Sequence, residues 1–305
     1  MRFQDYRLAC FTYRAFGLNI LSEIEFRGFR PSVGPPDVFV RLGVVPIHLD
    51  GASPLRGILY EASSRRFLFS VERVARYLAS DGNQIDIEPA PGADLESVLV
   101  FLHTCVFGAL LYQRGVLPLH ASAVIGARGA VVIAGRSGYG KSTLAGALHR
   151  LGFPVIADEI CAVETGPTPA VLPSNPCILL WPDAIERLGV EISSLRRQRP
   201  SVEKFVYPVD NECEDRAVPI QAIYFLEVVE SSGVSLTPVT GIDTIRFLAP
   251  NAYRNRFVES MNLSARLFLQ LQKIAGAVPM AKITRPASGF LLDELTALLT
   301  DHLAA

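Results

Sequence analysis

Apolar and polar residues alternate along the first third of the chain. The alternation has a period of two at residues 38–42, 67–71, 75–79 and 84–88, and this pattern predicts strands with one buried face. The triplet Asp-Gly-Asn at 81–83 lies between the last two segments and is typical of a hairpin turn. We therefore expect a small, mainly β domain over residues 1–93, in which no catalytic constellation is visible.

The pattern changes after the Pro-Ala-Pro-Gly sequence at residues 89–92. An apolar run follows, which predicts a helix at about residues 97–112 that opens a second domain over residues 94–305. The run contains His103 and is shorter than the ~20 residues that span a membrane. A buried core helix is the better interpretation.

The second domain has mixed signals for strands and helices. The expected strands are 119–125, 130–134, 155–157, 160–164, 178–180, 220–228, 234–238 and 280–283, and the expected helices are 143–151, 183–188, 262–275 and 291–303. The first two strands are joined by a turn at 126–129 and predict a hairpin. The mixture predicts an α/β (α+β) fold, with a mixed sheet flanked by helices.

Charge and cysteine content limit the function classes. The 29 Lys and Arg residues nearly balance the 30 Asp and Glu residues, so the net charge of -1 provides no field for nucleic acid or an anionic membrane. The five cysteines are scattered without a C-x-x-C pair, and residues 1–6 lack the apolar core of a signal peptide. We expect a cytoplasmic protein that binds neither nucleic acid nor membrane.

Residues 135–142, Gly-Arg-Ser-Gly-Tyr-Gly-Lys-Ser, match the phosphate-loop (Walker A) pattern without a mismatch. The loop follows a predicted strand and precedes a predicted helix, which is the context that phosphate binding needs. Lys141 can reach the β- and γ-phosphates, and the Ser142 hydroxyl is a usual ligand of Mg²⁺. The predicted nucleotide-binding residues are Gly135, Ser137, Gly138, Tyr139, Gly140, Lys141, Ser142 and Thr143.

Two acidic residues and a histidine are candidates for the chemistry. Asp158 ends a predicted strand seventeen residues after Lys141, and Glu159 follows it directly. Such a pair beside a triphosphate can divide metal binding and proton acceptance. His120 precedes Gly135 by fifteen residues on the paired strand, near the expected γ-phosphate. The alternative interpretations are that Asp158 is an acid in a turn, that Glu159 lies on the surface, and that His120 is a hydrogen-bonded residue of the core.

A basic segment follows the predicted helix at residues 183–188 of the second domain. Lys204 and the arginines 196, 197 and 199 can clamp phosphate or an acidic substrate when a loop closes. Such a charge run is more often a solvated loop, and we expect a loop over residues 193–201.

Three of these segments together resemble a known family. Residues 120–124 (His-Ala-Ser-Ala-Val), the phosphate loop and residues 156–159 (Ile-Ala-Asp-Glu) look like the catalytic core of bacterial HPr kinase/phosphorylase in order and spacing. The resemblance implies that Asp158 is the base toward the acceptor hydroxyl and that His120 lies near the γ-phosphate. It also implies that Ser142 and Glu159, with Asp158 beside them, are the magnesium neighbours, and that the cofactors are ATP and Mg²⁺.

The match is to a branch of this group rather than to HPr kinase/phosphorylase itself. The chain has Glu159 where the family usually has a second Asp, and the Asn-Pro-Gly-Arg stretch associated with phosphorolysis is not visible. Similarity to HPr-kinase-like proteins of peptide-modification gene clusters, several of which phosphorylate the C-terminal serine of a lasso-peptide precursor, extends over most of the chain. It is carried by residues 13–18, 22–24, 179–183, 278–280 and 283–286.

The resulting hypothesis is an ATP-dependent kinase with catalytic residues Asp158, His120 and Lys141, which phosphorylates a serine of a peptide or protein. Two alternatives remain open. The first is a nucleotide-dependent ATPase, switch or scaffold whose β domain binds a partner, and the second is a small-molecule phosphotransferase. A homo-oligomer also remains open.

Overall fold

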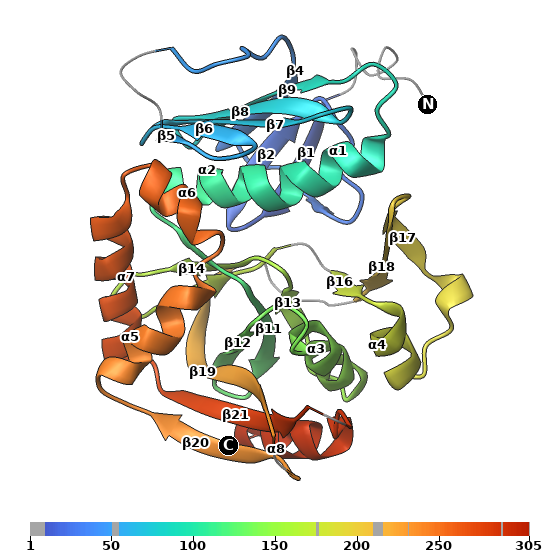
Figure 1. The fold of residues 1–305 in the computed structure, drawn as a ribbon, viewed down its shortest axis with the longest axis vertical. Helices are drawn as coiled ribbons and strands as arrows, with labels where there is room; N and C mark the ends of the chain where they lie inside the picture. Colours follow the sequence, from blue (N-terminus) through green and yellow to red (C-terminus); the bar gives the residue numbers. More distant parts are fainter. Residues whose placement is uncertain are drawn as a thin grey trace. The chain divides into compact units, whose positions relative to one another are not determined.

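The computed structural model describes residues 10–50, 55–174, 177–209, 216–230, 232–287 and 289–304. The predicted absence of a signal peptide concerns residues 1–6, which lie outside these ranges. The chain divides into two compact units. We call residues up to Pro118, with Arg254–Phe268, the N-terminal unit, and Leu119–Tyr253, with the residues from Leu269 onward, the phosphate-loop unit. Each has its own sheet, and the fold class is mixed α/β, as predicted (Figure 1).

The N-terminal unit is built on one sheet with the strand order β3-β1-β2-β4-β9-β8-β7-β6-β5. Its strands are β1 (Phe11–Ala15), β2 (Leu18–Ser22), β3 (Arg30–Pro31), β4 (Val38–Leu42), β5 (Leu55–Arg56), β6 (Tyr60–Ala62), β7 (Arg66–Val71), β8 (Ala75–Ser80) and β9 (Gln84–Pro89). The four strands predicted from alternation are confirmed as β4, β7, β8 and β9. The β8–β9 turn is also confirmed, with Asp81 and Gly82 at positive φ.

One face of this sheet is covered by a continuous helical segment. It comprises α1 (Leu95–Phe101), the π-helical turn η2 (Leu102–Val106) and α2 (Phe107–Arg114). Asp94 caps its start by accepting a hydrogen bond from the Ser97 N–H at 2.8 Å. Tyr77 of β8 donates its hydroxyl to the Val98 carbonyl at 2.9 Å, which fixes the segment against the sheet.

This segment, Leu95–Arg114, is longer than the predicted helix and is apolar enough by length and composition alone to cross a membrane. Its most apolar window is 67% buried inside the protein, and core helices of soluble proteins pass the same test. Val98, Leu102 and Leu110 are fully buried. The prediction of a buried core helix is therefore confirmed.

The compact units divide the chain differently from the predicted boundary at residues 93 and 94. Helices α1 and α2 belong with the N-terminal sheet, and the division falls at Pro118 within β10 (Leu117–Leu119). A later segment that contains α6 (Asn255–Ser260) also belongs to the N-terminal unit, because Phe257 packs on Tyr60 and Phe67 of its sheet. The sequence did not predict this return of the chain, because residues 254–268 are far along the sequence from the strands on which they pack.

The phosphate-loop unit has a mixed sheet with the order β14-β15-β19-β12-β11-β13, and β21 lies between β19 and β20. Its strands are β11 (Ala121–Gly126), β12 (Gly129–Gly135), β13 (Val155–Ala157), β14 (Cys161–Glu164), β15 (Ala170–Leu172), β19 (Val218–Val229), β20 (Ser235–Val239) and β21 (Met280–Pro286). The predicted hairpin is confirmed as β11–β12, with Ala121 opposite Ala134. Strands β12, β19 and β21 run parallel to one another.

Helices α3 (Lys141–Arg150) and α8 (Leu292–Ala304) pack against each other and against β11 (Figure 1). The core between them and the sheet contains fully buried aliphatic side chains, including Ile133, Leu144, Leu148 and Leu299. The remaining helices of the phosphate-loop unit, or shared with it, are α4 (Pro182–Arg187), η3 (Ile192–Ser194), α5 (Ile242–Leu248), η4 (Ala249–Asn251) and α7 (Ser264–Ala277). The core thus fixes the helix that leaves the phosphate loop.

A separate three-stranded sheet has the order β16-β18-β17, from β16 (Cys177–Leu180), β17 (Arg196–Arg199) and β18 (Val202–Pro208). The expected loop over residues 193–201 is wrong for residues 196–199, because Arg196 and Arg197 pair with Val206 and Phe205 of β18, although both arginines are solvent-exposed as expected. Pairing across the hairpin overrides the low strand propensity of a charged run.

We predict that Leu148→Ala lowers the free energy of unfolding by about 2–5 kcal/mol, because it opens a cavity in the core beneath α3. Leu151→Ala, three residues along the chain at a position 59% exposed, is the matched control and should change stability by less than about 0.5 kcal/mol. Denaturant midpoints of the two variants provide the measurement. Equal losses would contradict this assignment of the core.

Candidate functional site

The phosphate loop lies at the edge of the sheet where β12 and β13 end and β11 begins. Strand β11 runs antiparallel to both β12 and β13, so its start lies beside their ends. His120 immediately precedes β11, the loop immediately follows β12, and Asp158 immediately follows β13. Residues far apart in the sequence therefore meet at one point.

Glycines determine the path of the loop. Gly138 and Gly140 have φ values of +83° and +99°, in the left-handed region that favours glycine. A Cβ at Gly135 would lie 2.5 Å from the Leu226 carbonyl oxygen of β19, whereas nothing lies within 4 Å of a Cβ position at Gly138. The loop is thus tightly packed at its base and open at its middle, where an anion would lie.

Helix α3 begins directly at the end of this loop. Gly140 is its N-cap residue, and no side chain caps the first turn. The N–H groups of a helix's first turn have no partner within the helix, and the helix dipole places positive potential there. This end of α3 is therefore suited to bind a phosphate.

Lys141 is folded back onto the loop. Its ammonium group donates hydrogen bonds to the carbonyls of Gly135 at 2.8 Å and Arg136 at 3.3 Å, and the residue is only 6% exposed. Burial lowers the pKa of Lys141 to about 8, and the carboxylates of Asp158 and Glu159 partly oppose this shift. The lysine is positioned to exchange loop carbonyls for phosphate oxygens.

Asp158 is held by donors from three segments. One carboxylate oxygen accepts hydrogen bonds from the hydroxyls of Ser122 at 2.6 Å and Ser142 at 2.9 Å. The other accepts the Leu179 N–H at 2.9 Å. Burial raises the pKa of Asp158, while the Leu179 and Ser122 hydrogen bonds act to lower it. The carboxylate is fixed beside the loop serine.

Glu159 lies between two cationic or titratable partners. Its carboxylate is 3.0 Å from the Lys204 ammonium and 3.8 Å from Nδ1 of His120. Burial acts to raise the pKa of Glu159, but Lys204 and His120 outweigh it, so the pKa is lowered. Burial, with help from Lys141, also lowers the pKa of His120 and favours its neutral form. The backbone φ of Glu159 is +67°, which is strained for a residue with a side chain.

Two cavities meet at the start of the loop. The nucleotide-side cavity, of about 380 Å³, is lined by Ser137, Gly138 and the first turn of α3, together with Asp158, Glu159 and Lys204. The second cavity, of about 850 Å³, is lined by Gly135, Arg136 and Tyr139, the end of β19, and α5 with η4. His120 and Ser137 line both cavities.

Every predicted site residue lines one of these cavities. Ser137, Gly138, Gly140, Lys141, Ser142, Thr143, Asp158, Glu159 and His120 line the first, and Gly135 and Tyr139 line the second. Lys204 also lies in the site. In the parts of the chain that the structure describes, the arginines 196, 197 and 199 do not line either cavity; Arg197 instead lies 3.5 Å from Glu203 and over the Phe205 ring.

Sequence reasoning missed several contributors. Ser122 and the Leu179 N–H bind Asp158, and the Asn251 side chain accepts the Gly135 N–H at 2.8 Å. Phe290 and Arg285 also line the nucleotide-side cavity. Ser122 had a local signal, since it lies two residues after His120; the others are brought in by long-range pairing alone.

The donor set fits Mg²⁺ bound together with phosphate. The described residues contain no group of three His, Cys, Asp or Glu side chains placed to hold a metal ion by themselves. The Ser142 hydroxyl and Asp158 carboxylate are 2.9 Å apart, and hard oxygen donors of this kind suit Mg²⁺, which usually keeps waters and phosphate oxygens as its other ligands.

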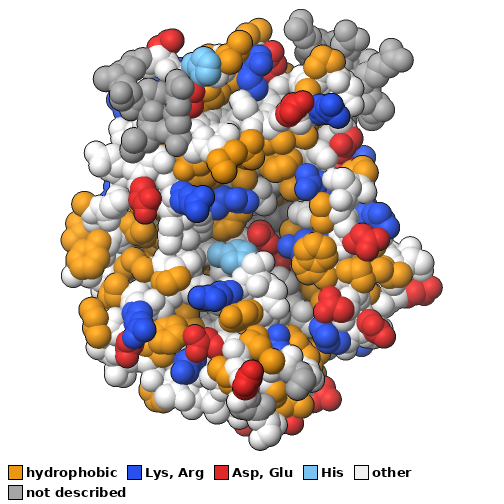
Figure 2. Space-filling view, in the orientation of Figure 1, with side chains coloured by type: hydrophobic (Ala, Val, Ile, Leu, Met, Phe, Trp, Pro, Cys, Tyr) orange, Lys and Arg blue, Asp and Glu red, His pale blue; other side chains and the backbone are white. Residues whose placement is uncertain are grey.

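The face drawn in Figure 2 has acidic, basic and apolar side chains interspersed. This mixture agrees with the net charge of -1 and shows no field of a single sign across that face.

Comparison with known proteins finds distant similarity to solved structures. No model of a protein family and no curated protein matches this sequence. Among solved structures, the chain is similar to the HPr(Ser) kinase/phosphatase from Coxiella burnetii, with 15% identity and a TM-score of 0.32. The similarity covers 61% of this chain and 95% of that one.

The buried lysine gives a stability prediction. The folded-state pKa of Lys141, about 8, lies below its ordinary value of 10.5, so the unfolded chain binds more protons between these pH values and stability should rise with pH across them. Relative to Lys141→Met, the wild-type protein should gain about 1–3 kcal/mol from pH 8 to pH 10.5. Parallel denaturant titrations measure this difference, and a difference independent of pH would contradict it.

Proposed function

We propose that the protein is an ATP- and Mg²⁺-dependent phosphotransferase that transfers the γ-phosphate to a hydroxyl, and specifically a serine hydroxyl of a peptide or protein. The observation that carries this proposal is the meeting of two cavities at His120 and Ser137, beside the loop lysine and two carboxylates. A phosphotransferase needs separate places for donor and acceptor that converge on one phosphorus atom.

The nucleotide-side cavity supplies groups for the phosphates. Loop N–H groups and the start of α3 bind the oxygens, and Lys141 offsets the negative charge that develops during transfer. The Ser142 hydroxyl, which donates a hydrogen bond to Asp158, would be a ligand of the metal ion. Bound Mg²⁺ would supply charge neutralisation between the β- and γ-phosphates.

The second cavity is the place for the acceptor. Its lining is apolar at Phe225, Leu226 and Phe247, and it also includes two arginines and two acidic residues, Arg136, Arg246, Glu227 and Asp243. Asn251 links this cavity to the loop, because its side chain accepts the Gly135 N–H and its carbonyl accepts the His120 N–H at 2.7 Å. At about 850 Å³ the cavity admits a peptide end as well as a small molecule.

The two carboxylates have different surroundings, which bears on their roles. Both oxygens of Asp158 already accept hydrogen bonds from protein donors, one of them from the loop serine. Glu159 faces the cavity with Lys204 and His120 as its partners. We therefore favour Glu159, assisted by neutral His120, as the proton acceptor, and Asp158 as the residue that positions Ser142. The sequence resemblance supports the opposite division, with Asp158 as the base.

The acceptor that we favour is the C-terminal serine of a lasso-peptide precursor. This choice rests on the sequence resemblance stated above, and a cytoplasmic location, where ATP is plentiful, follows from the same proposal. The large second cavity, which a water-activating ATPase or switch does not need, favours a transferase over that alternative. A small-molecule acceptor is the second candidate, and the size of the cavity admits it.

The transfer reaction is tested directly. Incubation with γ-labelled ATP, Mg²⁺ and a peptide that ends in serine should give acid-stable phosphate on the peptide, while the same peptide ending in alanine should stay unlabelled. Lys141→Ala should abolish labelling, because it removes the charge that contacts the phosphates. Phosphate release without any labelled acceptor would favour the ATPase alternative, and labelling of only a small molecule would exclude the peptide.

Two isosteric variants separate the carboxylate roles. Glu159→Gln should leave the dissociation constant of Mg²⁺-ATP within a factor of about three and lower kcat by about 10²–10⁴, since it removes the proton acceptor. Asp158→Asn should instead raise the Mg²⁺ concentration needed for half-maximal rate. If Asp158→Asn binds Mg²⁺-ATP normally and loses transfer while Glu159→Gln retains it, the base is Asp158.

A further inference from the structure

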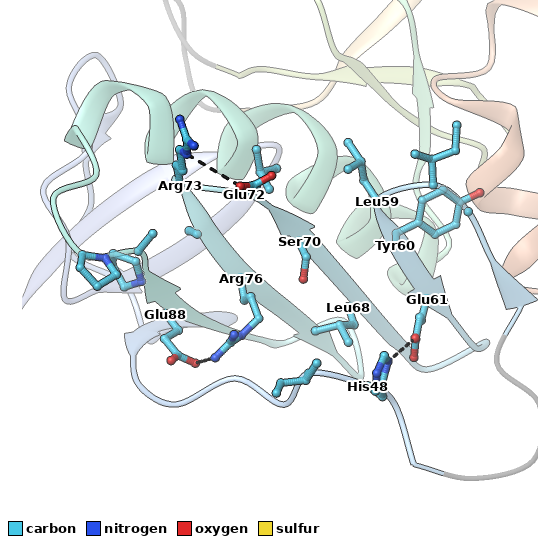
Figure 3. A pocket seen from close by; sticks show the side chains of 18 residues that line it. His48, Leu59, Tyr60, Glu61, Leu68, Ser70, Glu72, Arg73, Arg76 and Glu88 are labelled. Atoms are coloured by element: carbon cyan, nitrogen blue, oxygen red, sulfur yellow. Dashed lines mark hydrogen bonds and ion pairs between the residues drawn. The ribbon is translucent and has the colours of Figure 1, made fainter.

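The N-terminal unit contains a cavity of its own. Phe69 and Tyr77 lie on the face of the sheet that the helical segment covers, since both contact that segment. Successive residues of a strand point to opposite faces, so Leu68 and Ser70 of β7 lie on the other face. There they line a cavity of about 580 Å³ (Figure 3).

One wall of this cavity is an irregular segment that is fixed to the sheet at two points. The Val45 N–H donates to Glu88 at 2.7 Å, and the Leu49 N–H donates to Glu61 at 2.8 Å. Val45 and Leu49 are also buried in one cluster with two leucines of β7 and β8. Ile47, between these two points, lines the cavity. The wall is therefore preformed, which lowers the entropic cost of binding a ligand.

The charged side chains of the cavity pair with one another. Its lining includes three carboxylates and three basic side chains, which form three pairs: Arg76 with Glu88 at 2.7 Å, His48 with Glu61 at 2.8 Å, and Arg73 with Glu72 at 3.7 Å. The first two pairs lie on either side of Ser70 (Figure 3). Such a lining has no excess of basic groups and no unpaired carboxylate, so its electrostatic complement is an uncharged ligand.

Large apolar side chains are exposed around the cavity. Ile47, Ile58 and Leu59 line it with exposed fractions of 69%, 94% and 47%. Ile58 and Leu59 form the tip of the β5–β6 hairpin, a position where Gly, Asn or Asp is usual. One exposed apolar side chain is ordinary, but several around one cavity are typical of a binding surface.

The size of this surface indicates the kind of partner. A stable interface between two folded proteins uses about 20–30 residues on each side, whereas the exposed apolar rim here consists of three side chains. The cavity volume of about 580 Å³ lies within the range of about 300–1,000 Å³ that is usual for ligand sites. A narrow segment that inserts side chains fits this cavity, whereas a second copy of the chain or a membrane surface is too broad.

We propose that this cavity binds an extended segment of a peptide partner, and that the segment is apolar and uncharged. Ile47, Ile58 and Leu59 contact its apolar side chains, and the Ser70 hydroxyl on the cavity floor donates to one of its backbone carbonyls. The inference goes beyond the proposed function and does not depend on it, because no nucleotide takes part in the binding.

The test measures binding without nucleotide, by fluorescence anisotropy of a labelled probe. The probe is an acetylated and amidated peptide of leucine, glycine and serine, and the control peptide has every leucine replaced by serine. The wild-type protein should bind the probe and not the control peptide. Ile58→Ser should raise the dissociation constant of the probe about 5- to 30-fold, because it removes apolar contact area. Leu59→Ser should act in the same direction.

A matched variant separates this surface from apolar surface in general. Val33 is a fully exposed apolar residue of the same unit that does not line the cavity, so Val33→Ser should leave the dissociation constant unchanged. Because Ile58 is itself almost fully exposed, Ile58→Ser should also leave the denaturant midpoint at its wild-type value.

Four results would overturn the proposal. They are no binding of the probe, equal binding of the control peptide, equal weakening by Val33→Ser and Ile58→Ser, and self-association of the wild-type protein that Ile58→Ser abolishes. The last of these would assign the surface to a second copy of the chain. Since ATP is absent throughout, a failure of phosphate transfer leaves these results unaffected, and a failure of peptide binding leaves the proposed transfer reaction intact.

Discussion

The rest of the site depends on the hydrogen bonds that hold the Asp158 carboxylate. A partly buried carboxylate without partners would be strongly destabilising, so its donors are required as soon as the chain folds around it. They come from Ser122 of β11, Ser142 of α3 and Leu179 of β16. Hydrogen bonds to charged groups contribute about 1.5–3 kcal/mol each. One side chain therefore joins the hairpin, the phosphate loop and the separate small sheet.

Next to this fixed carboxylate, Glu159 is held in a strained conformation. Its positive φ turns the chain sharply after Asp158, so the two acidic side chains have different neighbours. Strain of this kind persists only where surrounding contacts compensate for it, and it is concentrated at functional sites. Here the Glu159 side chain forms an ion pair with Lys204 at 3.0 Å. A glutamate also reaches one methylene further than an aspartate, and here its carboxylate is paired with Lys204.

The phosphate loop itself is packed from several directions. Leu226 of β19 limits the space at Gly135, and Phe290 limits it at Gly140. Asn251 binds the Gly135 N–H, and Arg285 binds the Tyr139 carbonyl. The loop is consequently preorganised by four distant segments, and the same segments form the walls of the two cavities. Preorganised N–H groups and charges are the main source of catalysis in phosphoryl transfer.

Local patterns in the sequence determined much of the outline. Alternation predicted β4, β7, β8 and β9, because the period of two reflects the two faces of a strand directly. Glycine spacing predicted the phosphate loop and α3, since only residues without a Cβ accept that backbone path. The candidate residues His120, Lys141, Asp158 and Glu159 could be selected because each lies next to a recognisable strand or loop.

Tertiary structure alone decided which of these elements meet. Nothing in the local pattern showed that residues 254–268 return to the N-terminal unit or that Arg196–Arg199 forms a strand, because both depend on pairing with distant segments. The same is true of the Leu179, Asn251 and Phe290 contacts with the site. Period and propensity report the environment of a residue along its own element, whereas a binding site is formed by the packing of elements that are far apart in the sequence.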